Sequence, residues 1–564
     1  MAAEGRVTQV PAVFGEGRAR GVVLVTASAV GQALAAGVAA FATRDIFAAL
    51  HHGDGGIPVL SLLFLFLAGA AVAGLRVFGR VVAERLGQDY AISVRRSLFR
   101  HLTRMPSGAV AKRRTGALAL RFVGDLATAR NWVALGVTGA ISAAIVIPGA
   151  AIVLAALNPA LAAATAAPLL VAIAIMAAGA PLLGPIHRQF RKRRANLAID
   201  MMERVSTAPE LLLMGRDKIE LENLERRGRD LRLAAVERAG AAACLRSLPE
   251  FGTAAAAAAL LWVAFVSGAA PAEAAGALAV LGILVQPMRD LANVWDRRCA
   301  WRIAREKLEN VLSSPPLEFS NDTQAPRRDG PARVAFKGVW KGELSGFDAT
   351  LEPGRKVAIL GPTGAGKSTC LALAAGLEQA ERGAVEFDGV DIRALPLAER
   401  QRAVVYIGPR SPILQGSLRR ALTLGIAPRP DDAAIEAAAR AFGLGGVLDR
   451  LGGLEARISA GGHNLSSGEA RRVHIVRAAL GRPRLLLLDE ADGALDAAGR
   501  EAVRQIVRST AATTLQVTHD LHLARSAEVL WYIEGGALAA QGAPDDLLRG
   551  DGPAARFICP RSVA

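Results

Sequence analysis

One stretch of this sequence has the residue types and spacing that bind phosphate groups. It is the run Gly361-Pro362-Thr363-Gly364-Ala365-Gly366-Lys367-Ser368-Thr369, which fits the P-loop pattern G-x-x-x-x-G-K-[ST]. Its glycines let successive backbone N–H groups point at phosphate oxygens, and the helix that follows adds its positive dipole end. Lys367 can reach the β- and γ-phosphates, and the Ser368 hydroxyl can ligate Mg²⁺. We therefore predict a nucleotide site with ATP and Mg²⁺ as cofactors.

A second stretch supplies the acids that nucleotide hydrolysis requires. Arg484 is followed by four leucines, 485–488, and then by Asp489 and Glu490, about 120 residues after the P-loop; this run reads as a buried strand that ends in two acids. Asp489 is placed to hold Mg²⁺ together with Ser368. Glu490 can accept a proton from an attacking water, as a general base. A third strand, at 514–517, precedes His519, which could donate a hydrogen bond to a γ-phosphate.

Another turn could form a second anion-binding end. The run Ser466-Ser467-Gly468 opens a helix, so its N–H groups are free to contact an anion. Taken alone it is an ordinary helix cap. Asp496 follows a short turn after the two acids.

The elements that would position these residues fall in the second half of the chain. From Val334 onward, short β-type runs alternate with amphipathic helices, which is typical of an α/β domain. Residues 313–332 are rich in proline, serine, asparagine and glycine and read as a linker. We therefore predict domains at 1–312 and 333–564.

The first half of the chain reads as a membrane domain. Mean hydropathy is +0.30, and 52% of the residues are hydrophobic, which is high for a soluble protein. Apolar runs long enough to cross the hydrocarbon core, which takes about 20 helical residues, occur near 21–41, 57–75, 133–157, 159–183, 251–269 and 274–294. Two long basic segments, 76–130 and 187–246, separate them, whereas the other connections carry few cations. The positive-inside rule places these segments and both termini in the cytoplasm.

The order of these motifs resembles that of ATP-binding cassette (ABC) proteins. The residues that carry the resemblance are the P-loop, Leu465-Ser466-Ser467-Gly468-Glu469, Asp489 with Glu490, Asp496 and His519. The six-span half before them is similar to the ABC exporter fold, and the run Arg113-Arg114-Thr115-Gly116 resembles the first intracellular loop of such exporters. The fold implied is an all-α six-helix transmembrane domain followed by an α/β P-loop NTPase domain.

The resemblance also implies an assembly and a mechanism. Such half-transporters dimerise and bind ATP between the P-loop of one subunit and residues 466–468 of the other. Asp496 would communicate across the dimer. Coupling helices near Phe122–Ala129 and Val205–Met214 would dock on the nucleotide domains. The function implied is ATP-driven export by alternating access across the bacterial inner membrane.

Two parts of the sequence depart from the family pattern, and the residue that stacks on adenine is open. The strand at 404–407 is normally followed by a glutamine, and here Pro409 or Arg410 stands at the aligned position. Glu469 replaces the glutamine of the signature and brings a negative charge toward the expected ATP site. Trp340 is the candidate for the aromatic ring that stacks on adenine, and Phe336 is the alternative that reads as a core residue.

These departures keep other readings open. A heterodimer with a related half-transporter rivals the homodimer, and the chain could be a membrane-anchored, ATP-binding regulatory or degenerate subunit. A net charge of +16 also suits a nucleic-acid enzyme. The apolar spans and the place of the arginines argue against that class, so we expect membrane lipid and a second subunit as partners. The transported substrate is not predicted, and lipid, drug-like compound and peptide all remain open.

Overall fold

The computed structural model describes residues 10–15, 17–52, 57–111, 113, 118, 121–317, 319, 329–409, 411–493, 495–549 and 552–558. The chain divides into two compact units. The first spans Met1–Thr103 and Lys112–Pro315, and the second spans Arg104–Ala111 and Pro316–Ala564. This division differs from the predicted domain boundaries because eight residues from the membrane half belong to the second unit. The motif residues Arg114–Gly116 and half of the expected linker, 318 and 320–328, lie outside the described residues.

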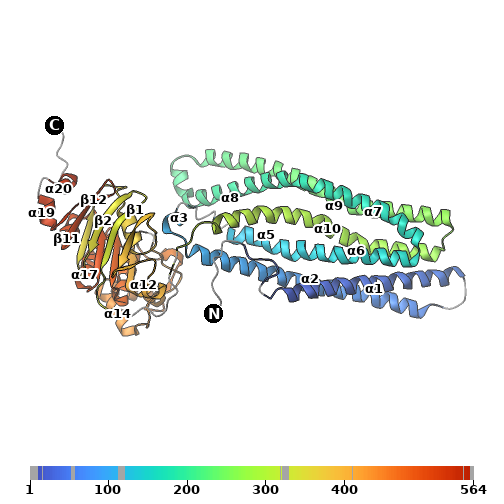
Figure 1. The fold of residues 1–564 in the computed structure, drawn as a ribbon, viewed down its shortest axis with the longest axis horizontal. Helices are drawn as coiled ribbons and strands as arrows, with labels where there is room; N and C mark the ends of the chain where they lie inside the picture. Colours follow the sequence, from blue (N-terminus) through green and yellow to red (C-terminus); the bar gives the residue numbers. More distant parts are fainter. Residues whose placement is uncertain are drawn as a thin grey trace. The chain divides into compact units, whose positions relative to one another are not determined.

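The first unit is built from long helices (Figure 1). Among the described residues, six helical segments are long and apolar enough to cross a membrane. This confirms the predicted six-helix membrane domain. The elements are α1 (Ala19–His52), α2 (Val59–Leu102), η1 (Arg121–Asp125), α5 (Leu126–Asn131), η2 (Trp132–Val137), α6 (Thr138–Leu157), α7 (Pro159–Gly179), η3 (Ala180–Leu182), α8 (Leu183–Leu213), α9 (Asp217–Ser267) and α10 (Pro271–Leu312).

Small residues set how closely these helices pack. A Cβ placed on Gly252 of α9 would lie 2.6 Å from the Ala172 side chain of α7, so a larger residue there would force the helices apart. Without a hydrophobic driving force between helices in lipid, such close backbone approach supplies much of the packing energy. The abundance of alanine and glycine therefore supports the bundle, even though it weakens the hydropathy pattern.

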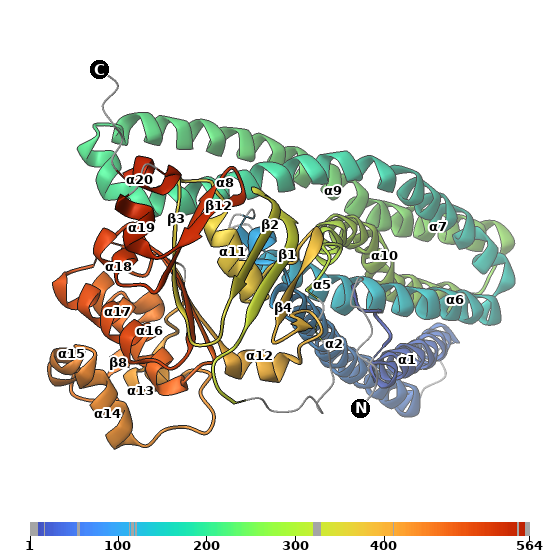
Figure 2. The same cartoon turned by 60° about the vertical axis from the view of Figure 1, so that its left-hand side comes forward.

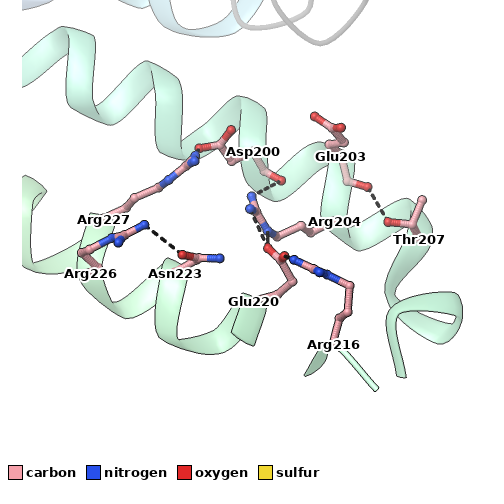
Figure 3. A network of polar contacts seen from close by, with 9 residues as sticks. All are labelled: Asp200, Glu203, Arg204, Thr207, Arg216, Glu220, Asn223, Arg226 and Arg227. Atoms are coloured by element: carbon pink, nitrogen blue, oxygen red, sulfur yellow. Dashed lines mark hydrogen bonds and ion pairs between the residues drawn. The ribbon is translucent and has the colours of Figure 1, made fainter. Parts of the chain in front are cut away.

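Charged side chains hold together the end of the α8–α9 hairpin (Figure 3). Glu220 accepts hydrogen bonds from Arg204, at 2.8 Å, and from Arg216, at 3.2 Å. Asp200 and Arg227 form a second ion pair along the same hairpin. The predicted coupling segment Val205–Met214 covers the end of α8, and the chain turns at Met214 and Gly215 before α9 begins.

The other predicted coupling segment does not form a separate helix at a turn. Residues 122–129 lie in η1 and α5, which continue through η2 into α6, and α5 packs against α2 and α10 inside the first unit. The prediction for Phe122–Ala129 is therefore wrong. The short helix of the first long basic segment is α3 (Ser107–Ala111), which belongs to the second unit.

The second unit is an α/β domain with two main sheets. The larger sheet has the order β12-β11-β3-β10-β9-β6, and all its neighbours are parallel except the edge strand β12. A four-stranded antiparallel sheet has the order β2-β1-β4-β5. The strands are β1 (Val334–Lys341), β2 (Leu344–Leu351), β3 (Lys356–Leu360), β4 (Arg382–Phe387), β5 (Val390–Asp391), β6 (Val404–Ile407), β7 (Gly416–Ser417), β8 (Arg457–Ile458), β9 (Leu485–Asp489), β10 (Thr513–Val517), β11 (Val529–Glu534) and β12 (Ala537–Gly542).

Helices cover both faces of the larger sheet, as βαβ connections require. The helix after the P-loop, α11, contributes Cys370, Leu371 and Leu373 to a core shared with β1, β2 and β3 (Figure 2). A second core joins β6 and β9 to helices α13 to α18. The helices of this unit are α11 (Lys367–Ala374), α12 (Leu397–Ala403), α13 (Leu418–Thr423), α14 (Asp432–Ala441), α15 (Gly445–Leu451), η4 (Ala460–Gly462), α16 (Ser467–Gly481), α17 (Ala497–Ser509), α18 (Leu521–Arg525), α19 (Pro544–Arg549) and α20 (Pro553–Ile558).

The α3 segment is tied into the second unit by polar contacts. The Ser107 amide donates to the Leu377 carbonyl at 3.0 Å. The Glu378 carboxylate accepts from the Ser107 hydroxyl at 3.0 Å and from the Gly108 amide. Glu378 is buried and also lies 3.6 Å from the Lys341 ammonium group. These contacts explain why residues 104–111 group with the second unit.

Candidate active site

Three neighbouring parallel strands bring the predicted catalytic residues to one edge of the larger sheet. β10 pairs with β3 on one side and with β9 on the other, in register at Val517 with Ile359 and Asp489. The P-loop follows β3, Asp489 ends β9, and His519 comes shortly after β10. Because ligands of open α/β sheets bind at the carboxyl ends of the strands, this edge is the candidate active site.

The backbone of the P-loop leaves no room for side chains at two positions. A Cβ on Gly361 would lie 2.1 Å from the Ile533 carbonyl oxygen of β11, and this residue has φ +152°. A Cβ on Gly366 would lie 2.6 Å from the Leu344 side chain, and φ there is +94°. Glycine is therefore required by the fold at both positions, independently of any ligand.

Lys367 is buried beneath this loop. Its ammonium group donates hydrogen bonds to the carbonyl oxygens of Gly361 and Pro362, both at 2.8 Å. Burial lowers the pKa of Lys367, and the negative charges of Glu490 and Asp489 oppose that change. The lysine thus lies inside the phosphate cradle with its donors satisfied by backbone carbonyls, which a phosphate oxygen can replace.

Ser368 and Asp489 meet as predicted. The Ser368 hydroxyl donates to Asp489 Oδ1 at 2.9 Å, and the Asp489 carboxylate is buried. The second oxygen of Asp489 accepts a hydrogen bond from the Tyr406 hydroxyl at 2.8 Å. Tyr406 reaches it from β6, the strand next to β9. These hard oxygen donors at one point fit the preference of Mg²⁺ for hydroxyl and carboxylate ligands.

Glu490 and His519 face each other at the open side of this edge. Glu490 Oε1 lies 3.5 Å from His519 Nε2, and both side chains are about half exposed. The Glu490 backbone has φ +47°, a left-handed conformation that glutamate rarely adopts. Its amide donates to the Val517 carbonyl at 3.1 Å, which anchors the strained turn to β10. An exposed carboxylate beside a histidine is suitably placed to accept a proton from water.

The segment after β6 contains Pro409, while Arg410 lies outside the described residues. Arg471 of α16 donates to the Gly408 carbonyl at 2.8 Å and thereby fixes this segment to the helix. His474, one turn along the same helix, is buried and contacts Arg477. Burial lowers the pKa of His474 to about 4, and the charges of Arg477 and Arg471 act in the same direction. The proline thus lies beside a cluster of basic side chains.

The Ser466–Gly468 turn begins α16 with a reciprocal cap. Ser466 Oγ accepts from the Glu469 amide at 3.2 Å, and the Glu469 carboxylate accepts from the Ser466 amide at 2.8 Å. Arg450 donates to the same carboxylate at 3.0 Å. Although burial opposes it, the Ser466 amide and the Arg450 guanidinium hold the pKa of Glu469 below its usual range. The Glu469 charge is therefore compensated within the chain.

Asp496 caps the next helix, α17, and is linked through Arg472 to α16. It accepts from the Gly499 amide at 2.7 Å and from Arg472 Nη1 at 3.0 Å. The Gly499 amide and the Arg472 guanidinium lower the pKa of Asp496. Among the described residues, no hydrogen bond or ion pair joins Ser466, Ser467, Gly468 or Asp496 to the P-loop of the same chain.

Trp340 lies on β1 with its side chain 46% exposed and its ring over Gly346. Phe336 is buried in the core, where its ring packs edge-to-face on Phe347 and Trp531. Of the two rings, only that of Trp340 is exposed enough for an adenine base to reach. Its stacking on adenine stays a prediction.

Sequence reasoning missed two functional candidates, Tyr406 and Arg471. All four residues of β6 are apolar or aromatic, so its sequence does not show that Tyr406 shares a face with Asp489 of β9. Arg471 carried no local signal, because its contact with Gly408 depends on how α16 packs.

Two family descriptions match the chain. Residues 344–493 match the ABC transporter family, and residues 21–275 match the ABC transporter transmembrane region. A solved structure of a bacterial Atm1-family ABC exporter with ATP bound superposes with a TM-score of 0.82 over 97% of this chain and 98% of that chain. Its sequence identity is 22%, so it shows the likeness of the fold alone.

Curated relatives match the chain over about half of its length. The mycobactin import ATP-binding/permease protein IrtB of Mycolicibacterium thermoresistibile is 33% identical over 299 residues, which are 51% of this chain and 51% of that protein. A multidrug efflux ATP-binding/permease protein of Mycobacterium tuberculosis is 31% identical over 294 residues, 50% of this chain and 24% of that protein. The matched segment is thus about half the length of the first relative. With a transmembrane region and an ATP-binding domain in one polypeptide, this chain belongs to the ABC transporters.

Proposed function

We propose that this chain is one half of a dimeric transporter that uses ATP hydrolysis to export a substrate from the cytoplasm. The observation that carries the proposal is the edge of the larger sheet, where Lys367, Ser368, Asp489, Glu490 and His519 lie together. The six long apolar helices of the same chain give hydrolysis a membrane domain to drive.

Each residue has a definite part in this proposal. The backbone of residues 361–369 and the Lys367 ammonium group hold the phosphates, while Ser368 and Asp489 would hold Mg²⁺, which neutralises developing charge when bound. Glu490 takes a proton from the attacking water. His519 donates a hydrogen bond toward the γ-phosphate. Tyr406 keeps the Asp489 carboxylate oriented, and with Arg471 it supports the segment in which Pro409 replaces glutamine.

A dimer is proposed because one chain leaves the site incomplete. The Ser466–Gly468 turn presents a helix N-terminus, yet no polar contact of the described residues links it to the P-loop of its own chain. In a symmetric head-to-tail pair, the turn of one subunit would close the P-loop of the other, at two equivalent sites. A homodimer is the simplest such assembly. Asp496, tied to the turn through Arg472, would sense the partner.

Export from the cytoplasm across the bacterial inner membrane, by alternating access, is the direction we propose. The two basic segments at 76–130 and 187–246 support a cytoplasmic position for the ATP-binding domain and both termini. One relative is named for mycobactin import and another for multidrug efflux. Transport in reconstituted vesicles should therefore be measured in both directions.

Mixing two inactive chains tests the shared site. Lys367→Ala destroys the P-loop function, and Ser466→Arg blocks the Ser466–Gly468 turn. Each variant alone should therefore hydrolyse no ATP. In a mixed dimer, one site combines both defects and the other is intact. Co-expressed chains should therefore recover roughly a quarter of wild-type ATPase activity, because half of randomly paired dimers carry one intact site. No recovery in verified mixed dimers would refute a site shared between subunits.

Replacing the proposed base tests the chemistry. Glu490→Gln should lower turnover by about a hundredfold or more, since general-base catalysis supplies roughly 10²–10⁴-fold, and it should trap ATP in the dimer. Unchanged turnover would refute the assignment of Glu490.

Pro409 favours a second candidate, a degenerate subunit that needs a related half-transporter. This candidate predicts that the pure chain binds ATP without hydrolysing it. It also predicts that activity appears only when a second half-transporter is supplied.

A further inference from the structure

The first unit contains a partly open cavity, lined by both apolar and charged residues, that the hydrolytic site does not use. It has a volume of about 460 Å³ and lies among α1, α2, η2, α6 and α10. This volume is in the range of small-molecule sites, roughly 300–1,000 Å³. The charged side chains that line it are Arg76 and Arg80 of α2 and Asp290 and Arg297 of α10.

These charges leave the cavity with a net positive charge of two. Arg76, Arg80 and Arg297 face a single carboxylate, Asp290, whose Oδ1 already accepts a hydrogen bond from Gln286 at 3.0 Å. Within the described residues, none of the three arginines forms an ion pair or a side-chain hydrogen bond. Arg297 Nη1 is buried without a hydrogen-bond partner. A buried guanidinium N–H without a protein partner is costly, so this group favours binding an acceptor.

The cavity lies near one end of the apolar spans. Arg76 is about 25 Å along α2 from Val59, and Asp290 is about 28 Å along α10 from Pro271, at 1.5 Å per residue. The two helices begin at the same side of the bundle, so these residues share one depth. The hydrocarbon core is about 30 Å thick, which puts the charges near its inner boundary in the proposed orientation.

The helix that faces the arginines is locally widened. The π-helical turn η2 (Trp132–Val137) contributes Ala134 and Leu135 to the wall, and α6 adds Thr138 and Ser142. Turns of this kind interrupt α-helices most often at functional sites, because they enlarge the helix and shift the side chains that follow. Small and hydroxylated residues on this side leave space beside the guanidinium groups.

We propose that this cavity binds the anionic head group, a carboxylate, sulfonate or phosphate, of an amphipathic molecule. The inference deepens the proposed transport function and rests on it, since an occupant at this depth is the substrate or a lipid that the substrate must displace. Arg80 and Arg297 supply the charge-assisted hydrogen bonds. Asp290 limits the affinity, so that the occupant can leave. The apolar part of the molecule contacts the surrounding helices.

Binding can be measured without nucleotide on the full-length chain in phosphatidylcholine nanodiscs. The probe is 11-(dansylamino)undecanoic acid, with its uncharged methyl ester and a dansylated alkylamine for comparison. The acid should bind saturably and more tightly than either comparison compound. Arg80→Gln and Arg297→Gln should each raise its Kd by about tenfold or more, the effect of a lost hydrogen bond to a charged group.

Two further variants separate recognition from structural support. Asp290→Asn removes repulsion and should lower the Kd of the acid by about threefold or more, whereas a damaged bundle would bind the probe less well. Arg80→Lys keeps the charge and should retain most of the affinity. Arg96→Gln, an exposed arginine of α2 outside the cavity, is the matched control and should bind as the wild type does.

The source of the head group is resolved by adding phosphatidylglycerol to the nanodiscs. If the cavity belongs to a phospholipid, phosphatidylglycerol displaces the acid. Native mass spectrometry then finds the lipid retained by the wild type and lost from Arg80→Gln. If phosphatidylglycerol does not displace the acid, the cavity is assigned to a separate amphiphile. Equal affinity for acid and ester, unchanged binding in both glutamine variants, or weaker binding in Asp290→Asn would overturn the proposal. Lys367→Ala should bind the probe normally, so failure of ATP hydrolysis and failure of this site are distinguishable.

Discussion

Replacing Glu378 by glutamine should release the α3 segment from the ATP-binding unit. The Glu378 carboxylate is buried and accepts hydrogen bonds from the Ser107 hydroxyl, at 3.0 Å, and from the Gly108 amide. Glutamine keeps the size and one acceptor oxygen but removes the negative charge. Hydrogen bonds to charged groups contribute about 1.5–3 kcal/mol each. We therefore expect the docked state of α3 to lose about 1.5–3 kcal/mol, because neutral hydrogen bonds replace part of the interaction.

Hydrogen exchange of the full-length chain measures this change directly. If the amides of residues 104–111 exchange through local opening, a loss of about 1.5–3 kcal/mol speeds exchange by roughly 10- to 150-fold. The matched control is Glu381→Gln. Glu381 lies 3.5 Å from the same Lys341 ammonium group that Glu378 approaches at 3.6 Å, but its side chain is 68% exposed and forms no hydrogen bond with the described residues of α3. Unchanged exchange in Glu378→Gln, or equal acceleration in Glu381→Gln, would refute the reasoning.

Three other predictions concern the ATP-binding unit. Tyr406→Phe leaves a buried oxygen of Asp489 without its hydrogen-bond donor. It should cost about 1–3 kcal/mol of stability in denaturant unfolding and raise the KM for Mg-ATP. Tyr532→Phe removes a hydroxyl that forms no described hydrogen bond, and it should have neither effect. Because the pKa of His474 is lowered to about 4, the unfolded chain binds a proton before the folded chain does. Stability should therefore fall by up to about 3 kcal/mol as pH drops from about 6.5 to 4. His474→Leu should flatten that pH dependence, and an equally steep profile in this variant would contradict the prediction. Glu469→Ala should cost about 0.5–2 kcal/mol of stability through the lost helix cap. Glu469→Gln should change ATP affinity, measured by nucleotide titration, by less than about threefold, because Arg450 and the Ser466 amide already compensate the charge.

Local patterns predicted the parts of the site that lie close together in sequence. The P-loop is a continuous strand, turn and helix, so residues 361–369 could be read directly. The meeting of Ser368 with Asp489 followed from two buried strands whose carboxyl ends share an edge. The hydropathy of the first half predicted the six spans, because length and apolar content alone decide whether a helix can cross a bilayer.

Contacts between distant segments were beyond such patterns. Ser107 and Glu378 are 271 positions apart, and nothing local indicates that they bond. The hydroxyl of Tyr406 reaches Asp489 only because β6 lies in register beside β9, with Tyr406 opposite Leu487. The π-helical turn η2 likewise depends on packing against α2 and α10, which contact it. Sequence reasoning therefore named the residues of the proposed catalytic core but not the residues that support them.

The left-handed backbone at Glu490 has a consequence for how this protein tolerates substitution. A non-glycine residue held in this region costs about 1–3 kcal/mol, which the rest of the domain must offset. Glycine relieves that strain, and asparagine does so in part. Glu490→Gly should therefore raise the melting temperature of the chain while it abolishes turnover. Selection for thermal stability alone would move this position away from glutamate, so a library of variants must be screened for ATP hydrolysis as well as for folding.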